Sequence, residues 1–426
     1  MMRTKWNALP KALIIAVAAV APPAVHAQGS SEFSPARLAR VDTILESYVA
    51  AGHIAGAVAL VLQDGHVVYE RAVGWADREA RVPMTPGTIF RIASQTKALT
   101  SVAILQLMEE GRLMLEQPVG RYIPTFAHTT VAVQEGDSAG IVPARRAITI
   151  RDLMTHTAGI SYGTSAAVAT RYARAGLGPA AGWGWYTADK DEPICTTMER
   201  LGTLPFVAQP GEAWVYGYAT DVLGCVAERV SGVPLDELIR TRITEPLRMT
   251  DTRFFLDPAE RARLAAVYAS DSTGRAVRAG DDARGQGHYI DGPRRSHSGG
   301  AGLLSTARDY ARFLEMIRNG GALDGVRILA PRTVKLLTTN QVGSLYPTTG
   351  LGWSLAFETI ERFGAADLGE VGAYGWGGAY GSWYRVDPES RLVMVFMVQL
   401  LLPHRTDIRQ KFPTLIYQAL TGSGTR

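Results

Sequence analysis

A serine and a lysine three residues apart, Ser94 and Lys97, are the residues of this chain best suited to nucleophilic chemistry. On a helix, side chains three positions apart lie on one face, so the amine can hydrogen-bond the hydroxyl. A serine hydroxyl attacks a carbonyl poorly until a base takes its proton, and lysine is such a base only where burial or a neighbouring cation keeps it neutral. The apolar run over residues 102–108 predicts a buried helix with Ser94 at its start. The Ser94 backbone N–H would there help to bind an oxyanion.

The scarcity of lysine makes this Ser-x-x-Lys pair informative. Lysine and arginine together number 44, and nearly all of them are arginine. No other lysine has a serine three positions before it; these lysines are Lys5, Lys11, Lys190, Lys335 and Lys411. The alternative interpretation is a serine cap beside a solvated lysine, which is common at helix starts.

A tyrosine at a helix start is the first candidate partner of this pair. Residues 210–224 run from a Pro-Gly turn into a predicted helix, and Tyr216 lies where the helix begins. If Lys97 or another cation lowers its pKa, Tyr216 can act as general base and then as general acid. By itself, a tyrosine at such a position more often packs in a core.

The stretch Trp376-Gly377-Gly378-Ala379 is the second candidate partner. It directly precedes a predicted strand, and its glycines would let an acyl substrate lie against an exposed strand edge. The Ala379 N–H would then complete an oxyanion hole with the Ser94 N–H. The alternative is an ordinary glycine-rich loop with aromatic packing.

Two other residues look like catalytic groups but are predicted to be structural. His156 lies in residues 151–160, a predicted helix ending at Gly159, where a histidine usually satisfies nearby backbone groups. Ser161 is the central residue of a Gly-x-Ser-x-Gly sequence at residues 159–163. That motif requires a tight turn from a buried strand into a helix, whereas the residues before Ser161 look helical.

The N-terminus predicts export. Arg3, Lys5 and Lys11 precede an apolar run over residues 12–21, and a small-residue cleavage site at residues 25–27 follows. Residues 1–27 are therefore expected to be a signal peptide, with Gln28 as the mature start and a periplasmic or secreted destination. A membrane anchor is the alternative, but the run is too short to span a bilayer. We expect no stable membrane insertion.

Composition limits the partners. The formal net charge of +4 is small and scattered, so no nucleic-acid partner is expected. Histidine and cysteine do not cluster at metal-ligand spacing, so no metal is expected, and we predict no cofactor. The two cysteines, Cys195 and Cys225, either form a disulfide in an oxidising compartment or remain separate buried thiols.

The order of predicted elements indicates an antiparallel sheet. A helix over residues 37–51 is followed by two strands, 56–63 and 66–74, that flank an Asp-Gly turn. Near the C-terminus, strands at residues 381–387 and 391–398 precede a helix over 407–420. We therefore predict an α/β (α+β) fold, an antiparallel sheet flanked by helices with an inserted all-helical domain. Residues 28–125 and 295–426 would form the sheet domain and residues 126–294 the insertion, with a cleft between them.

The ordered motifs together resemble the serine β-lactamase and penicillin-binding-protein superfamily, most closely its class C-like branch known as family VIII esterases. They are Ser94-x-x-Lys97, Tyr216-x-Tyr218 and Trp376-Gly377-Gly378, joined by similar stretches at residues 153–159, 210–224 and 302–310. The resemblance implies that Ser94 is the acylated nucleophile, that Lys97 and Tyr216 share proton transfer, and that the Ser94 and Ala379 amides hold the oxyanion. Two coupled groups titrate as a pair, so the first base is left open.

Two departures from the family pattern concern the substrate. Class C β-lactamases have asparagine at the position of Tyr218 and Lys-Thr-Gly in place of Trp376-Gly377-Gly378. Loss of that lysine removes a cation suited to the carboxylate of a β-lactam, and Trp376 offers an apolar wall instead. Tyr218, Trp376, Gly377 and Gly378 are therefore expected to contact the substrate.

The favoured hypothesis is a secreted carboxylesterase acting on small molecules, with weak β-lactam hydrolysis. A β-lactamase or D-amino-acid peptidase that cleaves cell-wall-like amides is the alternative, favoured if a cation lines the pocket from elsewhere. A penicillin-binding sensor that is acylated without turnover is the third. Acyl transfer to an alcohol or amine and the oligomeric state stay open.

Overall fold

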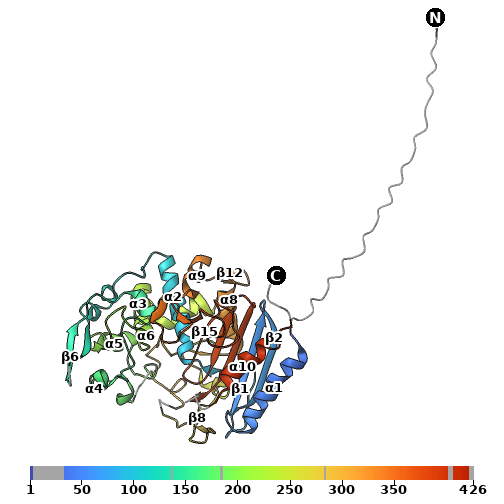
Figure 1. Cartoon of the computed structure of the whole chain (residues 1–426), viewed down its shortest axis with the longest axis horizontal. Helices are drawn as coiled ribbons and strands as arrows, with labels where there is room; N and C mark the ends of the chain where they lie inside the picture. Colours follow the sequence, from blue (N-terminus) through green and yellow to red (C-terminus); the bar gives the residue numbers. More distant parts are fainter. Residues whose placement is uncertain (3–32, 136–137, 183–185, 283–284, 402–405, 422–426) are drawn as a thin grey trace. The chain divides into compact units, whose positions relative to one another are not determined.

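The core of the structure is an eight-stranded antiparallel sheet, and its strands come from both ends of the chain (Figure 1). The computed structural model describes residues 1–2, 33–135, 138–182, 186–282, 285–401 and 406–421. The expected signal peptide therefore falls almost entirely outside the described residues. In spatial order the strands are β13 (Leu351–Trp353), β14 (Glu358–Ile360), β15 (Tyr374–Gly377), β16 (Trp383–Asp387), β17 (Leu392–Val398), β1 (Gly56–Gln63), β2 (His66–Asp77) and β3 (Val82–Pro83).

The predicted hairpin and the two C-terminal strands are confirmed, and they meet at the centre of this sheet. β1 pairs with β2 on one side and with β17 on the other, with Ala57 opposite Val398. All eight residues of β1 are buried. Because side chains alternate along a strand, Leu60 belongs to the core on one face, whereas Ala59 and Val61 belong to the core on the other.

Helices cover both faces. On one face, α1 (Pro35–Ala50) and α10 (Ile408–Tyr417) lie side by side, which confirms both predicted terminal helices (Figure 1). On the other face, α8 (Ala307–Arg318) packs against β1, β16 and β17. The helix α2 (Thr96–Glu109) packs into the same hydrophobic core as α8 and also contacts the insertion.

The insertion is mainly helical, but the prediction that it is all-helical is wrong. The strands β5 (Thr130–Glu135) and β6 (Ser138–Pro143) pair antiparallel, and β7 (Pro205–Phe206) adds to them. Short β-branched runs form this hairpin, although alanine, glycine and proline dominate the surrounding composition. The insertion also contains α3 (Ile150–Met154), α4 (Ala166–Arg174), α5 (Ile194–Leu201), α6 (Ala219–Ser231), α7 (Leu235–Ile239), β8 (Tyr268–Ser270) and β9 (Ala276–Arg278).

The remaining elements are short. β8 pairs in parallel with β18 (Leu400–Leu401), so the insertion is joined to the sheet domain. Residues from Phe33 onward form one contact unit, and the predicted domain boundaries stay a prediction. The other short elements are β4 (Phe90–Arg91), β10 (Leu304–Ser305), β11 (Ala322–Leu323), β12 (Val326–Arg327) and α9 (Pro331–Thr338), with η1 (Ala93–Gln95), η2 (Val119–Arg121), η3 (Pro124–Phe126), η4 (Pro179–Ala181), η5 (Arg240–Thr244), η6 (Pro258–Arg263) and η7 (Gly343–Leu345). Among the described residues, no helix is both long enough and apolar enough to cross a bilayer.

Two features of the insertion settle questions left by the sequence. Cys195 on α5 and Cys225 on α6 form a disulfide, with their Cα atoms 4.9 Å apart. The predicted helix over residues 151–159 is shorter than expected, because α3 ends at Met154 and His156 has a φ of +57°. A residue with positive φ cannot continue a right-handed helix.

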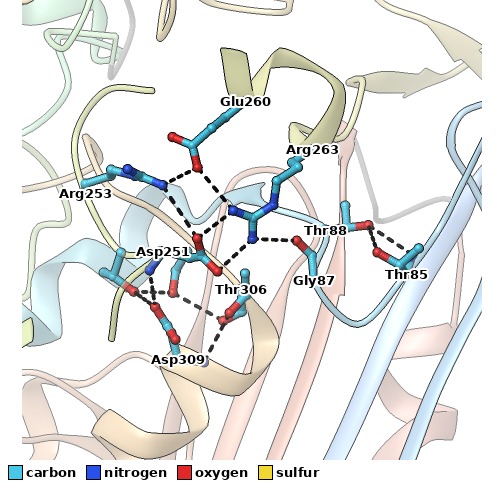
Figure 2. A network of polar contacts seen from close by, with 11 residues as sticks. Thr85, Gly87, Thr88, Asp251, Arg253, Glu260, Arg263, Thr306 and Asp309 are labelled. Atoms are coloured by element: carbon cyan, nitrogen blue, oxygen red, sulfur yellow. Dashed lines mark hydrogen bonds and ion pairs between the residues drawn. The ribbon is translucent and has the colours of Figure 1, made fainter. Parts of the chain in front are cut away.

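A polar network ties the end of the insertion to the sheet domain (Figure 2). Arg263 donates to both Asp251 oxygens, at 2.8 and 2.7 Å, and to the Gly87 carbonyl. Asp309, in the first turn of α8, accepts from the Asp251 N–H at 2.8 Å. Gly87 lies just before β4, and β4 leads to Ser94, so this network helps to fix the approach to the nucleophile.

Candidate active site

Ser94 lies at the start of α2, as the sequence predicts, but on a single 3₁₀ turn. β4 pairs with β10 and leads directly into η1, which contains Ser94 and passes into α2. The preceding residue, Ala93, is fully buried and has a φ of +44°. A non-glycine residue in that region is strained, and such strain clusters at functional sites. Ser94 is partly exposed between buried neighbours, so its hydroxyl can meet a substrate.

Lys97 points at this hydroxyl from the next turn. Its side chain is only 2% exposed, and Nζ donates to Ser94 Oγ at 3.3 Å. Nζ also donates to the Gly300 carbonyl at 2.8 Å and to Tyr162 Oη at 3.1 Å. The alternative interpretation of a solvated lysine is wrong, because the helix faces the core on nearly every side.

Tyr162 is a site residue that sequence reasoning missed. Besides accepting from Lys97, it lines the same cavity as Ser94. Burial raises the pKa of Tyr162 well above its usual value, and the nearby Tyr216 and Asp221 raise it further. The only sequence signal for Tyr162 is its position inside the Gly-x-Ser-x-Gly stretch. In that motif the serine, here Ser161, is the expected nucleophile.

A glycine explains how Tyr162 reaches the site. A Cβ on Gly217 would lie 2.2 Å from the Ile160 carbonyl oxygen and 2.6 Å from the Ser161 Cα. Only glycine therefore lets residues 160–162 lie directly against the segment that carries Tyr216. The two tyrosine rings meet edge to face, with centroids 5.8 Å apart.

Tyr216 also contacts Lys97, and it is part of an aromatic wall. Lys97 Nζ is 4.8 Å from the centroid of the Tyr216 ring, a cation–π contact. Tyr216 Oη accepts from Trp376 Nε1 at 2.9 Å, which joins the second and third sequence motifs. The indole of Trp353 packs edge-on against Trp376, with centroids 4.7 Å apart.

His156 lies behind this wall and not in the cavity. It is 1% exposed, and its ring centroid is 4.7 Å from that of Tyr216. Burial lowers the pKa of His156 well below its usual value, and the Lys97 charge lowers it further. A neutral imidazole therefore packs against Tyr216 while its backbone carbonyl accepts from Val215 N–H at 2.7 Å.

The end of β15 forms the other side of the site. Trp376 and Gly377 pair with β16, whereas in the described chain β14 pairs only with Tyr374 and Gly375, so one edge of β15 is open at this point. Part of the predicted glycine-rich loop is thus strand. A Cβ on Gly378 would lie 2.6 Å from the Ile92 carbonyl oxygen, so a glycine is needed for β15 to approach η1.

A cavity of about 270 Å³ lies between these groups. Its lining comprises Ser94, Tyr162, Tyr216, Trp376, Gly377, Gly378, Ala379 and Arg409. The structure thus brings together Ser94, Tyr216 and the whole predicted stretch 376–379, with Lys97 directly beneath. No signal in the sequence points to Arg409, because only the packing of α10 brings this residue to the site.

Arg409 is a cation beside the open edge of β15. A Cβ on Gly377 would lie 2.6 Å from Arg409 Nη2, so the absence of a side chain at Gly377 makes room for the guanidinium. Burial lowers the pKa of Arg409, and Glu358 partly opposes this. Among the described residues, Arg409 has no hydrogen bond or ion pair with another side chain.

Two residues singled out from the sequence, Tyr218 and Ser161, do not line the cavity. Tyr218 is fully buried, and its hydroxyl accepts from Gly178 N–H at 3.0 Å. Its ring packs edge-on against Tyr162, so the expected direct contact with substrate is replaced by support of Tyr162. Ser161 is 5% exposed, and its Oγ accepts from Gly163 N–H at 3.1 Å, as in an ordinary turn.

Comparison with known proteins identifies the family of this chain. The Beta-lactamase family model matches residues 41–415. Esterase EstB of Burkholderia gladioli is 34% identical over 363 residues, which span 81% of this chain and 86% of EstB. Protein Rv1367c of Mycobacterium tuberculosis is 35% identical over 82% of this chain and 86% of its own length.

Among solved structures, EstCE1 superposes with a TM-score of 0.74 and 28% identity. The match covers 91% of this chain and 98% of EstCE1, which is described as a hydrolase with promiscuous acyltransferase activity. The match extends over both the sheet and the insertion, so the architecture is that of the β-lactamase and transpeptidase fold. This chain therefore belongs to the β-lactamase family and is a carboxylesterase-like serine hydrolase.

Proposed function

We propose that this protein hydrolyses carboxylic esters through an acyl-enzyme on Ser94. The observation that carries the proposal is the contact of 3.3 Å between the buried Lys97 amine and Ser94 Oγ, at the base of an open cavity. The relative EstB, which is named an esterase, supports the reaction class. The aromatic walls suit the acyl or alcohol part of an uncharged ester.

In the first half of the reaction, Ser94 Oγ attacks the ester carbonyl carbon. Lys97 and Tyr216 share the proton that Oγ loses, and the Ser94 and Ala379 N–H groups stabilise the oxyanion. The bond between the carbonyl carbon and the alcohol oxygen then breaks, and the leaving alcohol takes up the proton. In the second half, water attacks the acyl carbon, loses a proton to the same pair, and releases the acid and Ser94.

The Trp376 side chain occupies the place where related β-lactamases have a lysine, and this favours neutral esters. The indole N–H is already used by Tyr216. We therefore expect β-lactam hydrolysis to be a weak side activity. An alcohol that enters the cavity in place of water would give acyl transfer, the second activity named for EstCE1.

Arg409 supports a second candidate function, hydrolysis of amides that carry a carboxylate. A β-lactam or a D-amino-acid peptide needs a cation near the acylation site, and Arg409 offers one from α10. Arg409→Gln should then raise KM for a carboxylate-bearing cephalosporin at least tenfold and leave KM for a neutral p-nitrophenyl ester unchanged. Equal effects on both substrates would contradict a carboxylate-binding role.

The decisive experiment compares a short p-nitrophenyl ester with a chromogenic cephalosporin. Ser94→Ala should lower ester turnover at least a thousandfold and Tyr216→Phe at least a hundredfold. Ser161→Ala, the matched control, should retain most activity. Dominant cephalosporin turnover would favour the amide hydrolase, and a single burst of acylation without turnover would favour the penicillin-binding sensor.

We also propose that the protein is exported and that residues 1–27 are removed. The Cys195–Cys225 disulfide supports an oxidising compartment. Expression in a bacterial host followed by N-terminal sequencing of the periplasmic fraction should give a chain that begins at Gln28. Retention of Met1 on a cytoplasmic, reduced product would contradict export.

A further inference from the structure

Asp221 is a buried carboxylate near the nucleophile, and the proposed reaction does not use this carboxylate. It lies in the first turn of α6 and is 1% exposed. Its Oδ1 accepts from the Ser298 hydroxyl, from Gly300 N–H at 3.1 Å and from the Thr187 hydroxyl at 3.3 Å. Three donors from two separate segments therefore hold one carboxylate oxygen in place.

Gly300 links this carboxylate to Lys97. The Gly300 N–H donates to Asp221, while the Gly300 carbonyl accepts from Lys97 Nζ at 2.8 Å. A Cβ on Gly300 would lie 2.5 Å from Asp221 Oδ2, so only glycine permits this approach. Any movement of Asp221 would thus move the carbonyl that orients the Lys97 amine.

The charges of the two groups also complement each other. Burying an ammonium group without a counter-charge is unfavourable, and Asp221 is a buried carboxylate that interacts electrostatically with Lys97. Burial raises the pKa of Asp221, while Lys97 and the three donors oppose that rise. The other titratable groups around the pair are Tyr162, Tyr216, Tyr218 and His156.

We propose that Asp221 is a positioning residue that fixes the Lys97 amine against Ser94 through Gly300 and balances its charge when Lys97 holds the serine proton. This role rests on the function proposed above, because it presumes that Ser94 is activated by Lys97. It adds a residue of α6 to the machinery, although α6 itself does not line the cavity.

The test is the pH dependence of Ser94 labelling by diisopropyl fluorophosphate, followed by intact mass. Labelling forms a bond between Ser94 Oγ and phosphorus and releases fluoride, so it reports activation of the serine without an ester substrate. Removing the carboxylate takes a negative charge away from the site, and a nearby negative charge favours the protonated form of a basic group. Asp221→Asn should therefore move the inflection of the labelling rate to lower pH by about one unit and lower the plateau rate at least tenfold.

Thr187→Val is the matched control, because it removes one donor to Asp221 and keeps the charge. It should leave the inflection in place. An unshifted inflection in Asp221→Asn would overturn the proposal, and so would an equal shift in both variants.

Gly300→Ala keeps the test valid if Asp221→Asn does not fold. The added methyl would press on Asp221 while both charges remain, so the plateau rate should fall at least tenfold without a shift of the inflection. A wild-type plateau in a folded Gly300→Ala protein would overturn the proposal. A wild type that is labelled at Ser94 yet turns over no ester would reject only the esterase function, whereas a wild type not labelled at Ser94 would reject both.

Discussion

The Ser94 hydroxyl meets a lysine whose amine has three hydrogen-bond partners. One partner is the nucleophile itself, the second is a backbone carbonyl, and the third is the Tyr162 phenol. A buried amine held by these three contacts has little freedom to turn away from the serine. Pre-orientation of this kind lowers the cost of reaching the transition state.

Tyr162 is expected to contribute directly to turnover. Tyr162→Phe removes an acceptor of Lys97 Nζ and should lower kcat about tenfold to a hundredfold, with KM nearly unchanged, measured on a p-nitrophenyl ester. Tyr289→Phe is a matched control, since the buried Tyr289 hydroxyl has no hydrogen-bond partner among the described residues. A kcat for Tyr162→Phe equal to that of the control would show that Tyr216 suffices.

The local motifs were predictable at this scale, and the long-range neighbours were not. Helical spacing predicts that Ser94 and Lys97 lie together. Tyr216 and Trp376 become candidate site residues because they follow this pair in the order typical of the family. Tyr162 and Arg409 reach the cavity through close packing around Gly217 and Gly377. A sequence shows that a glycine is present but not which segment approaches it.

Among the secondary-structure elements, α3 depends on one carboxylate. Asp152 forms a capping box with Thr149 and accepts two bonds from Arg146, at 2.6 and 2.8 Å. Burial alone would raise the pKa of Asp152, but the Arg146 and Thr149 donors outweigh burial and hold the pKa below its usual value. A lowered pKa stabilises the fold above the unfolded-state value near 4, and that stability is lost as the pH falls further.

Asp152→Asn should therefore lower the free energy of unfolding by about 1–3 kcal/mol at pH 7. The difference from the wild type should shrink below about pH 4, where the wild-type carboxylate also becomes protonated. Urea denaturation at both pH values measures this. A difference that is the same at pH 7 and pH 3 would mean that packing, and not charge, explains the loss.

Helices and strands with a long, clear hydrophobic pattern were predicted correctly from the sequence, whereas short elements with few characteristic residues were missed. The alternation and the Asp-Gly turn predicted β1 and β2, and the apolar run predicted β17. The hairpin of β5 and β6 was missed because only a few β-branched residues mark it within an alanine- and glycine-rich region. The end of α3 was missed because His156 has a backbone conformation that its residue type does not reveal.

The Cys195–Cys225 disulfide cross-links α5 and α6 within the insertion, and its main effect is on the unfolded chain. Its sequence separation of 30 residues corresponds to a loop-closure contribution of about 3–4 kcal/mol at 25 °C. Replacing both cysteines by serine should lower the free energy of unfolding by about that amount, measured in urea. Turnover per folded molecule should be retained, and an unchanged free energy of unfolding would contradict the entropic account.

Because β1 pairs with β17, the active site can form only late in the synthesis of the chain. Ala57 lies opposite Val398, and Ser94 faces residues 376–379, so neither the central sheet nor the oxyanion site can close until almost the whole polypeptide has left the ribosome. Contacts between such distant segments make folding slow. Until then the long apolar edge of β1 has no neighbour from the C-terminal half, and this nascent chain should depend on a chaperone that shields a single hydrophobic hairpin.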